Sequence, residues 1–559
     1  MMEENSFGAN IIEILTTGMY QDSKIIYREY IQNACDQIDK AEELGILSSR
    51  NADSRYPDLG QGEVNIWLKP EDRYIIIEDN ATGIKAENFQ RTLLNIADSD
   101  KIMGQNKGFR GIGRLCGLAY CKRLVFTSRW IDEPIVSIMT CDAHKMLEMI
   151  NEANTKVKRH SANDVINEIT EFSTRPAEES DPKHFFRVEL IDINKENEEL
   201  FGGRDEDNLE QLTDYLSFVA PVPYQANFYY RSEIYAHAKS LNVRIDEYNI
   251  KINGEQIFKK YKTHLKTSKG QEDVFGVEFH NFISEDSSLL GWMWFGKTYF
   301  RAAIKEEEIS RGLRLRKENI QIGDDVTLRN MFTREASRRG NNYFIGEIFA
   351  VSRKLIPNSQ RSYFNENPVR IDFEHRLKDY FNNTLYYIYR DGSEIDASLN
   401  KMKSFNEEIV VFEQKTIDGE FWDVKERDRK KDELKEKAQE AEKIKNKLER
   451  KRESSRSILT SEIIERRAKE IPMVAESKII GNVSNSLQNR NNEYTKNDER
   501  IIPKKSKNKF LVHKMFPQAS RNDQKLLYEK IDKIFDIIRD STDKKTAENI
   551  INKIKEELE

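Results

Sequence analysis

Cysteine and histidine are both scarce in this sequence. Four cysteines occur among 559 residues, all of them before residue 142, and no two are spaced as Cys-x-x-Cys. The eight histidines are scattered without the spacing of metal ligands. These shortages argue against a disulfide framework and against a structural zinc site. We therefore expect a reducing, intracellular compartment, the cytoplasm.

Long apolar runs and a large excess of one charge are also missing. The first ten residues, MMEENSFGAN, lack a basic region followed by an apolar stretch, and the most apolar run, 289–295, is far too short to span a bilayer. Lys and Arg total 90 against 96 Asp and Glu, for a net charge of -6. We expect a soluble protein, without a membrane partner, that meets any charged partner through a local patch.

The length predicts several domains, because 559 residues are too many for one core. Residues 1–200 alternate helix and strand signals, and residues 205–395 keep a globular composition with β-rich stretches. Residues 423–475 are dominated by charges of both signs. Residues 476–509 are rich in Asn, Ser and Lys, as a linker is, and residues 510–559 regain the apolar periodicity of a helical hairpin.

The charged segment predicts a helix that either packs in a coiled coil or is solvated on all sides. Its sparse apolar residues recur every three or four positions: Leu434, Ala438, Ala441, Ile444 and Leu448. That spacing fits a coiled-coil seam of about two heptads. It fits a solvated single helix equally well, and the sequence leaves both interpretations open.

The segment 27–41 predicts an amphipathic helix with reactive groups on one side. Its polar stripe consists of Glu29, Asn33, Asp36 and Lys40. The opposite side carries apolar residues, namely Tyr27, Ile31, Ala34, Ile38 and Ala41. A surface helix would have the same pattern. The chemistry indicates more, since Asn33 offers a neutral oxygen to Mg²⁺ and Glu29 could polarise a water against a phosphate.

An acidic turn follows the apolar strand predicted at 74–77. Asp79 could accept a hydrogen bond from the exocyclic amine of a purine, and Gly83 would let the backbone approach the ring. An ordinary strand exit has the same composition, because Asp, Asn and Gly are common in turns.

Glycines dominate the stretch 104–115. Gly108, Gly111 and Gly113 precede an apolar, helix-like run, and backbone amides in such a loop can point toward a phosphate. The order of glycines is not that of a Rossmann fingerprint, and no GxxxxGK[ST] motif occurs in the chain.

In order and spacing, these three motifs resemble the GHKL superfamily of ATPases, which joins DNA gyrase, the ninety-kilodalton heat-shock chaperones, histidine kinases and MutL. Residues 28–36, REYIQNACD, resemble the R-E-L-I-S-N-A-S-D of the chaperones (the HtpG-like proteins), and residues 96–99, IADS, are similar to their I-A-K-S. Residues 108–111, GFRG, resemble the G-F-R-G of MutL. Residues 355–361, LIPNSQR, resemble the chaperones' L-P-L-N-x-S-R loop, and residues 312–316 lie where that family has a G-x-[RK]-L strand.

The resemblance implies an α+β protein: an N-terminal Bergerat-type α/β sandwich that binds ATP, then an α/β middle domain of the transducer type. In the family's pattern Glu29 is the general base, Asn33 holds Mg²⁺, Asp79 binds the adenine amine, and Arg361 reaches the γ-phosphate from the middle domain. Further ATP contacts would be Asp36, Gly83, Ile84, Ser99, Lys101, Gly108, Phe109, Arg110, Gly111, Ile112 and Gly113.

Two positions depart from the family's pattern. Ala81 replaces the first glycine of D-x-G-x-G, and Phe186 stands about where a threonine near the adenine is expected. We expect the contacts to adenine to be rearranged and the affinity for ATP to be modest.

Two classes of function remain after the resemblance. A histidine kinase is disfavoured, because Glu29 stands where kinases usually have asparagine. The first class is a heat-shock protein 90-like ATPase, a homodimer that closes on ATP and remodels a protein client or partner subunit. The second is a DNA-linked clamp like MutL or MORC, with the lysine run Lys504–Lys514 as a nucleic-acid contact. Proteins of this type also occur in antiviral defence, a role the resemblance permits.

Overall fold

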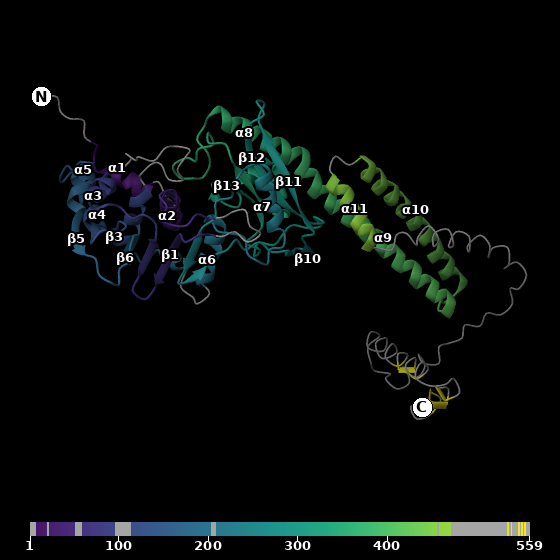
Figure 1. Cartoon of the computed structure of the whole chain (residues 1–559). Helices are drawn as coiled ribbons and strands as arrows, with labels where there is room; N and C mark the ends of the chain where they lie inside the picture. Colours follow the sequence, from purple (N-terminus) through teal and green to yellow (C-terminus); the bar gives the residue numbers. More distant parts are fainter. Residues whose placement is uncertain are drawn as a thin grey trace, which may run out of the picture. The chain divides into compact units, whose positions relative to one another are not determined.

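The computed structural model of the chain (Figure 1) describes residues 7–18, 22–50, 59–95, 113–202, 208–454 and 458–470, with scattered residues between 531 and 554. The chain divides into two compact units. The first combines Met1–Asp396 with Ser454–Ile464, and the second combines Ala397–Glu453 with Glu465–Glu559.

A large sheet organises the N-terminal part of the first unit. Its strands run in the order β5-β4-β3-β6-β2-β1-β7-β8, and every neighbouring pair is antiparallel except β1 with β7. The strands are β1 (Glu63–Lys69), β2 (Tyr74–Asp79), β3 (Cys121–Arg129), β4 (Ile135–Asp142), β5 (Thr170–Pro176), β6 (Phe185–Ile193), β7 (Asn249–Ile252) and β8 (Glu255–Gln256). The last two come from beyond residue 205, so the sheet also draws on the segment expected to form the middle domain.

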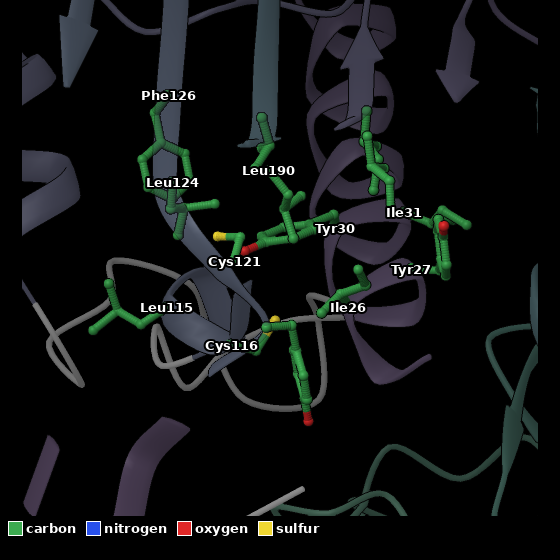
Figure 2. Close-up of a cluster of buried hydrophobic side chains, with 14 of the residues drawn as sticks. Ile26, Tyr27, Tyr30, Ile31, Leu115, Cys116, Cys121, Leu124, Phe126 and Leu190 are labelled. Carbon is green, nitrogen blue, oxygen red and sulfur yellow. The ribbon is translucent and has the colours of Figure 1, made fainter. Parts of the chain in front are cut away.

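Helices cover the apolar face of this sheet. They are α1 (Asn10–Glu13), the π-helical η1 (Ile14–Gly18), α2 (Ile25–Glu43), α3 (Ala86–Leu94), the 3₁₀ segment η2 (Gly113–Ala119), α4 (Ala143–Asn154), α5 (Ala162–Ile169) and the 3₁₀ segment η3 (Glu198–Phe201). Alternate residues of β2 are buried, as a strand with one covered face requires. In Figure 2, Tyr30 of α2 points toward Leu124 of β3 and Leu190 of β6, while Tyr27 and Ile31 lie on another side of the helix. These side chains belong to one buried cluster, together with Ile26 and Phe126. The predicted α+β class, with a helix-covered sheet at the N-terminus, is confirmed.

A second sheet organises the rest of the first unit. Its order is β11-β12-β15-β13-β14, and a separate pair is formed by β9 and β10. The strands are β9 (His264–Thr267), β10 (Gly270–Asp273), β11 (Gly276–Ile283), β12 (Leu289–Lys297), β13 (Gly312–Lys317), β14 (Ile320–Ile322) and β15 (Ile345–Ala350). The helices are α6 (Asn208–Val219), α7 (Arg231–Ser240), α8 (Pro368–Tyr380), the 3₁₀ segments η4 (Thr327–Met331) and η5 (Glu335–Tyr343), and the π-helical η6 (Phe381–Leu385).

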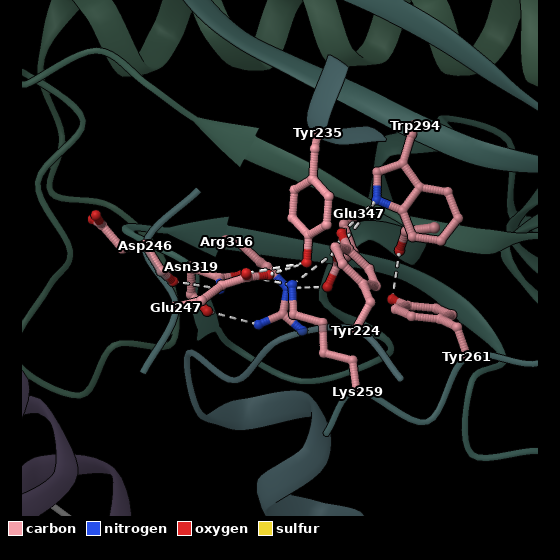
Figure 3. Close-up of polar contacts among 11 residues, drawn as sticks. Tyr224, Tyr235, Asp246, Glu247, Lys259, Tyr261, Trp294, Arg316, Asn319 and Glu347 are labelled. Atoms are coloured by element: carbon pink, nitrogen blue, oxygen red, sulfur yellow. Dashed lines mark hydrogen bonds and ion pairs between the residues drawn. The ribbon is translucent and has the colours of Figure 1, made fainter. Parts of the chain in front are cut away.

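A group of charged side chains lies buried against this second sheet (Figure 3). Lys259, Arg316 and Glu347 are all fully buried. Arg316 Nε donates to Glu347 Oε1, and Lys259 Nζ lies 3.1 Å from Glu347 Oε2. Tyr224 donates its hydroxyl to the same carboxylate. We call Lys259, Arg316 and Glu347 the ionic core.

The second unit is built on a helical hairpin. The long helices are α9 (Tyr386–Asp418), which starts in the first unit, and α10 (Val424–Ser454); α11 (Ile458–Glu470) follows. Lys401 pairs with Glu440 and Lys437 with Glu408, so α10 runs antiparallel to α9. The apolar residues that pack between them are Phe405, Ile409, Leu434, Ala438 and Ala441. The charged helix is therefore packed on one side and is not a solvated single helix.

Several expectations lie outside the described residues. They are the linker 476–509 and the lysine run Lys504–Lys514, and most of the predicted hairpin 510–559. In the part of the chain that the structure describes, no helix is both long enough and apolar enough to cross a bilayer.

Candidate functional site

Helix α2 carries the predicted reactive groups. Its predicted apolar side is buried, with Tyr27, Ile31, Ala34, Ile38 and Ala41 each at most 3% exposed. The first three residues of the predicted polar stripe are covered at least in part: Asp36 is buried, Asn33 is half-buried, and the side chain of Glu29 is only 12% exposed. Lys40, at the end of the stripe, is exposed. The part of the stripe from Glu29 to Asp36 therefore faces other parts of the protein, which a solvated surface helix would not do.

The N-terminal end of the stripe meets a loop more than 300 residues away. Arg361 Nε lies 3.3 Å from Glu29 Oε1, and the neighbouring Arg28 Nη2 donates to the carbonyl of Gln360 at 2.9 Å. Both bonds join α2 to the loop between β15 and α8. The structure thus brings together the two residues to which the family pattern gives catalytic roles.

The backbone of this loop is held in an unusual conformation. Arg361 has a φ of +53°, in the left-handed region that side chains other than glycine rarely adopt. Its amide donates to the carbonyl of Asn358 at 3.1 Å, and its carbonyl accepts from the amide of Gly323 at 2.7 Å. These bonds fix the direction in which the Arg361 side chain leaves the loop.

The segment after the glycine-rich stretch is attached to the same part of α2. A Cβ built on Gly113 would lie 2.2 Å from Glu29 Oε2, so a larger residue at position 113 would require the Glu29 side chain to move. The hydroxyl of Tyr30 donates to the Arg114 carbonyl at 3.0 Å and accepts from the Gly117 amide at 3.1 Å. Burial raises the pKa of Tyr30 and lowers the pKa of Arg114.

Of the predicted lid residues, the structure describes only Gly113. The others, Ser99, Lys101, Gly108, Phe109, Arg110, Gly111 and Ile112, lie outside the described residues.

The acidic turn lies at the other end of the polar stripe. Asp79 is 4% exposed, and its Oδ1 accepts from the amide of Ala81 at 3.0 Å. The hydroxyl of Thr82 donates to Gln37 Oε1 at 3.0 Å. Gln37 is two helical turns beyond Glu29 on α2, and Asn33 is on the turn between them. The helix therefore connects the Arg361 loop to the turn that follows Asp79.

Gly83 and Ile84 fix the end of this turn against β3 and β6. Gly83 has a φ of +67°, and a Cβ there would lie 2.0 Å from the carbonyl oxygen of Arg129. The amide of Ile84 donates to Ser128 Oγ at 2.8 Å. Glycine is needed at position 83 for both the conformation and the close approach.

The two departures from the family's pattern lie side by side. Phe186 is directly opposite Asp79 in the pairing of β2 with β6, and its ring centroid is 6.0 Å from that of Phe126. Ala81 is fully buried, and its carbonyl lies 2.6 Å from His184 Nδ1. An aromatic ring therefore occupies the place next to Asp79 where the family has a hydroxyl.

The donor set on α2 fits a magnesium ion held with phosphates. No group of three or more His, Cys, Asp or Glu side chains within the described ranges could hold a metal by itself. Mg²⁺ in nucleotide sites usually takes one or two protein oxygens and completes its shell with phosphates and water. One amide oxygen from Asn33, on the turn after Glu29, satisfies that requirement.

A cavity of about 780 Å³ borders the Arg361 loop within the first unit. Arg28 and Arg361 line it on one side, and Tyr215, Phe218 and Arg314 line it from α6 and β13. The guanidinium of Arg314 stands over the Phe218 ring at 4.2 Å.

The sequence analysis did not predict the contacts of Arg28, Gln37, Thr82 and Ser128. Arg28 and Gln37 lie on α2, the helix whose polar stripe it identified.

Comparison with known proteins identifies the domain. Residues 28–175 match the family model of the histidine kinase-, DNA gyrase B- and HSP90-like ATPases. The chain is similar to the chaperone protein HtpG of Orientia tsutsugamushi (strain Boryong), with 36% identity over 93 residues, 16% of this chain and 14% of the relative. It is 27% identical over 138 residues to that of Psychrobacter cryohalolentis and 29% identical over 133 residues to that of Acinetobacter baylyi, in both cases 22% of this chain and 20% of the relative.

The chain thus contains a GHKL-type ATPase domain with HtpG-like similarity, as its motifs predicted. The matched segments cover a fifth or less of these relatives.

Proposed function

We propose that this chain binds ATP with Mg²⁺ along α2 and hydrolyses it, with Glu29 as the general base. The observation that carries the proposal is the meeting of Glu29 and Arg361 beside Gly113, on a helix that lies inside the matched ATPase segment. An acid and an arginine from distant segments on one side of a helix are the groups that phosphoryl transfer needs.

In the proposed reaction, a water oxygen attacks the γ-phosphorus while the bond to the bridging β–γ oxygen breaks. Glu29 takes the proton of that water, and the products are ADP and inorganic phosphate. A magnesium ion held by Asn33 would neutralise charge on the phosphates. Asp79 would accept a hydrogen bond from the adenine amine, as a buried carboxylate at the end of a strand can.

Arg361 has two partners in this proposal. In the structure it pairs with Glu29 at 3.3 Å. When ATP binds, the γ-phosphate would offer the guanidinium a second and more highly charged anion. Transfer of Arg361 to the phosphate would release the Glu29 carboxylate to accept a proton from water, so a single side-chain movement would complete the site.

The larger activity is also a proposal. We infer a homodimer whose N-terminal domains close on ATP and reopen after hydrolysis, and which acts on a protein client or partner subunit. The similarity to the chaperone protein HtpG supports this proposal, within the ATPase segment. A test is whether the protein suppresses aggregation of a heat-unfolded model enzyme in the presence of ATP. Equal suppression with and without ATP would contradict a cycle driven by closure.

The test of hydrolysis is the Glu29→Ala variant. Removal of a general base should lower ATP turnover by about 100-fold or more while equilibrium binding of ATP persists. Glu43→Ala is the matched control, because Glu43 is exposed near the end of the same helix. Wild-type turnover in Glu29→Ala would remove the proposed mechanism.

A further inference from the structure

A concentration of arginine lies in the second half of the first unit. Residues 327–343 contain four arginines and one glutamate, a local charge of +3 (4 − 1), although the whole chain carries -6. Arg334 and Arg339 are exposed, and Arg338 is half-buried. A fifth arginine, Arg390 on α9, has a side chain that is 47% exposed.

Hydrogen bonds and ring contacts join the segment that carries Arg334, Arg338 and Arg339 to the start of α9, which carries Arg390. The hydroxyl of Tyr389 donates to the carbonyl of Ser337 in η5 at 3.4 Å. The Tyr389 ring lies 5.0 Å from that of Tyr343 and 5.6 Å from that of Tyr386. At the start of η5, Thr333 Oγ1 donates to Asn382 Oδ1 at 2.9 Å. Segment 333–343 therefore packs along η6 and the first turns of α9.

Arg334, which directly precedes η5, and the arginines of η5 have few anionic partners of their own. Among the residues that the structure describes, neither Arg334 nor Arg338 has a carboxylate within ion-pair distance, and the buried Nε of Arg338 has no hydrogen-bond partner. Arg390 pairs with its neighbour Asp391 at 3.1 Å and stands over the ring of Tyr387 at 4.6 Å. A local excess of positive charge with few anionic partners attracts an external anion.

We infer that this surface binds the phosphate backbone of single-stranded nucleic acid. We name it the arginine–tyrosine patch and define it as Arg334, Arg338, Arg339, Tyr343, Tyr387 and Arg390. Guanidinium groups bind phosphates through paired hydrogen bonds. Half-buried tyrosines at the same surface offer ring edges and faces on which unpaired bases stack. An acidic peptide would use the arginines but has no need of the rings.

The patch is independent of the nucleotide site and of the lysine run Lys504–Lys514. Its binding can be measured without ATP, so failure of the proposed hydrolysis would leave this inference standing. The reverse also holds, because none of the six residues belongs to the α2 site.

The test compares full-length variants by fluorescence anisotropy with a labelled single-stranded oligothymidylate over a range of salt concentrations. Arg334→Glu with Arg339→Glu should weaken binding at least tenfold. It should also lower the slope of log K against log salt by about 1.4, since each phosphate contact on a single strand contributes about 0.7. Lys158→Glu with Arg159→Glu is the control of equal charge change, at an exposed loop between α4 and α5. It should bind like the wild type, and all variants should unfold at the wild-type temperature.

Further variants and ligands distinguish single-strand binding at the patch from binding of a duplex, binding through the lysine run, and binding of an acidic peptide. Tyr387→Leu should weaken binding to the single strand by about tenfold and binding to a duplex much less, because only unpaired bases stack. Three results would overturn the inference: equal losses in the patch variant and its control, a loss confined to a Lys504→Glu, Lys505→Glu and Lys507→Glu variant, or preferential binding of poly-glutamate over the oligonucleotide.

Discussion

Two pairings of an acid with an arginine differ sharply in their surroundings. Glu29 and Arg361 meet at 3.3 Å, at the edge of two segments, with side chains 12% and 10% exposed. Glu347 meets Arg316 and Lys259 in the ionic core, where all three side chains are fully buried. We propose that the first pair separates when a phosphate binds. The second is enclosed by protein, with no exposed side chain.

The pKa shifts in and beside the ionic core follow from burial and from its ion pairs. Burial opposes ionisation of Glu347, but Arg316 and Lys259 outweigh it and lower its pKa to about 2. Burial, helped by Arg316, lowers the pKa of Lys259 to about 7. Burial also raises the pKa of the nearby Glu247 to about 8. Strong shifts are often used to locate catalytic groups, and here they mark a structural core.

The comparison predicts its largest effect in the ionic core. Glu347→Gln keeps the shape of the side chain but leaves Arg316 and Lys259 buried without a counter-charge. We expect a loss of about 3–5 kcal/mol of unfolding free energy, the usual cost of breaking a buried pair. Urea unfolding measures it, with the exposed Glu335→Gln as control. A loss below about 1 kcal/mol would mean that this region is not a rigid ionic core.

At the proposed site, the same kind of change should affect turnover and spare stability. Arg361→Ala is expected to lower ATP turnover by at least about 100-fold, as loss of an arginine on a transferring phosphoryl group does. Binding of ATP should change little. The control is Arg353→Ala, an exposed arginine in the same segment. Turnover at the wild-type rate would show that Arg361 has no role in hydrolysis.

Tyr30→Phe sharpens the comparison by testing how firmly η2 is attached to α2. The variant removes one hydrogen bond to the Gly117 amide and one to the Arg114 carbonyl. We expect a loss of about 1–3 kcal/mol in thermal or urea unfolding. Tyr229→Phe, at a side chain that is 77% exposed, should have no effect. Equal stability of both variants would show that Tyr30 does not anchor the segment.

The smallest predicted effect is a dependence on pH. The pKa of Glu247 rises from 4.5 to about 8 on folding, so the folded protein prefers the protonated acid. That contribution to stability is complete below pH 4.5 and is lost as the pH rises through about 8. Melting temperatures across this window should fall less in Glu247→Gln than in the wild type. Glu233→Gln, exposed on α7, should keep the wild-type dependence; identical profiles for all three proteins would contradict the assignment.

The sequence predicted the elements whose pattern is local. Helix α2 and strand β2 follow from apolar periodicity. Strand β5 did not, because its residues, TEFSTRP, show little apolar alternation at the edge of the sheet. The addition of β7 beside β1 joins positions more than 180 residues apart, which no local pattern encodes.

The same distinction applies to the sites. Glu29, Asn33 and Asp79 lie in short motifs, so they could be named from the sequence, and their roles stay predictions. Arg361 was named from the family resemblance, and its contact with Glu29 depends on folding of the whole first unit. The ionic core escaped prediction because Lys259, Arg316 and Glu347 come from three separate segments, each with an unremarkable local sequence.

The central claim is that α2 and the turn after β2 form one ATP site. Equilibrium binding of ATP with Mg²⁺ to Glu29→Ala, with and without Asp79→Ala, tests it most directly, because no hydrolysis interferes. The account predicts saturable binding to the single variant and at least about tenfold weaker binding to the double variant, the usual cost of losing a hydrogen bond to a charged group. Equal binding to both proteins, or no binding to either, would contradict it.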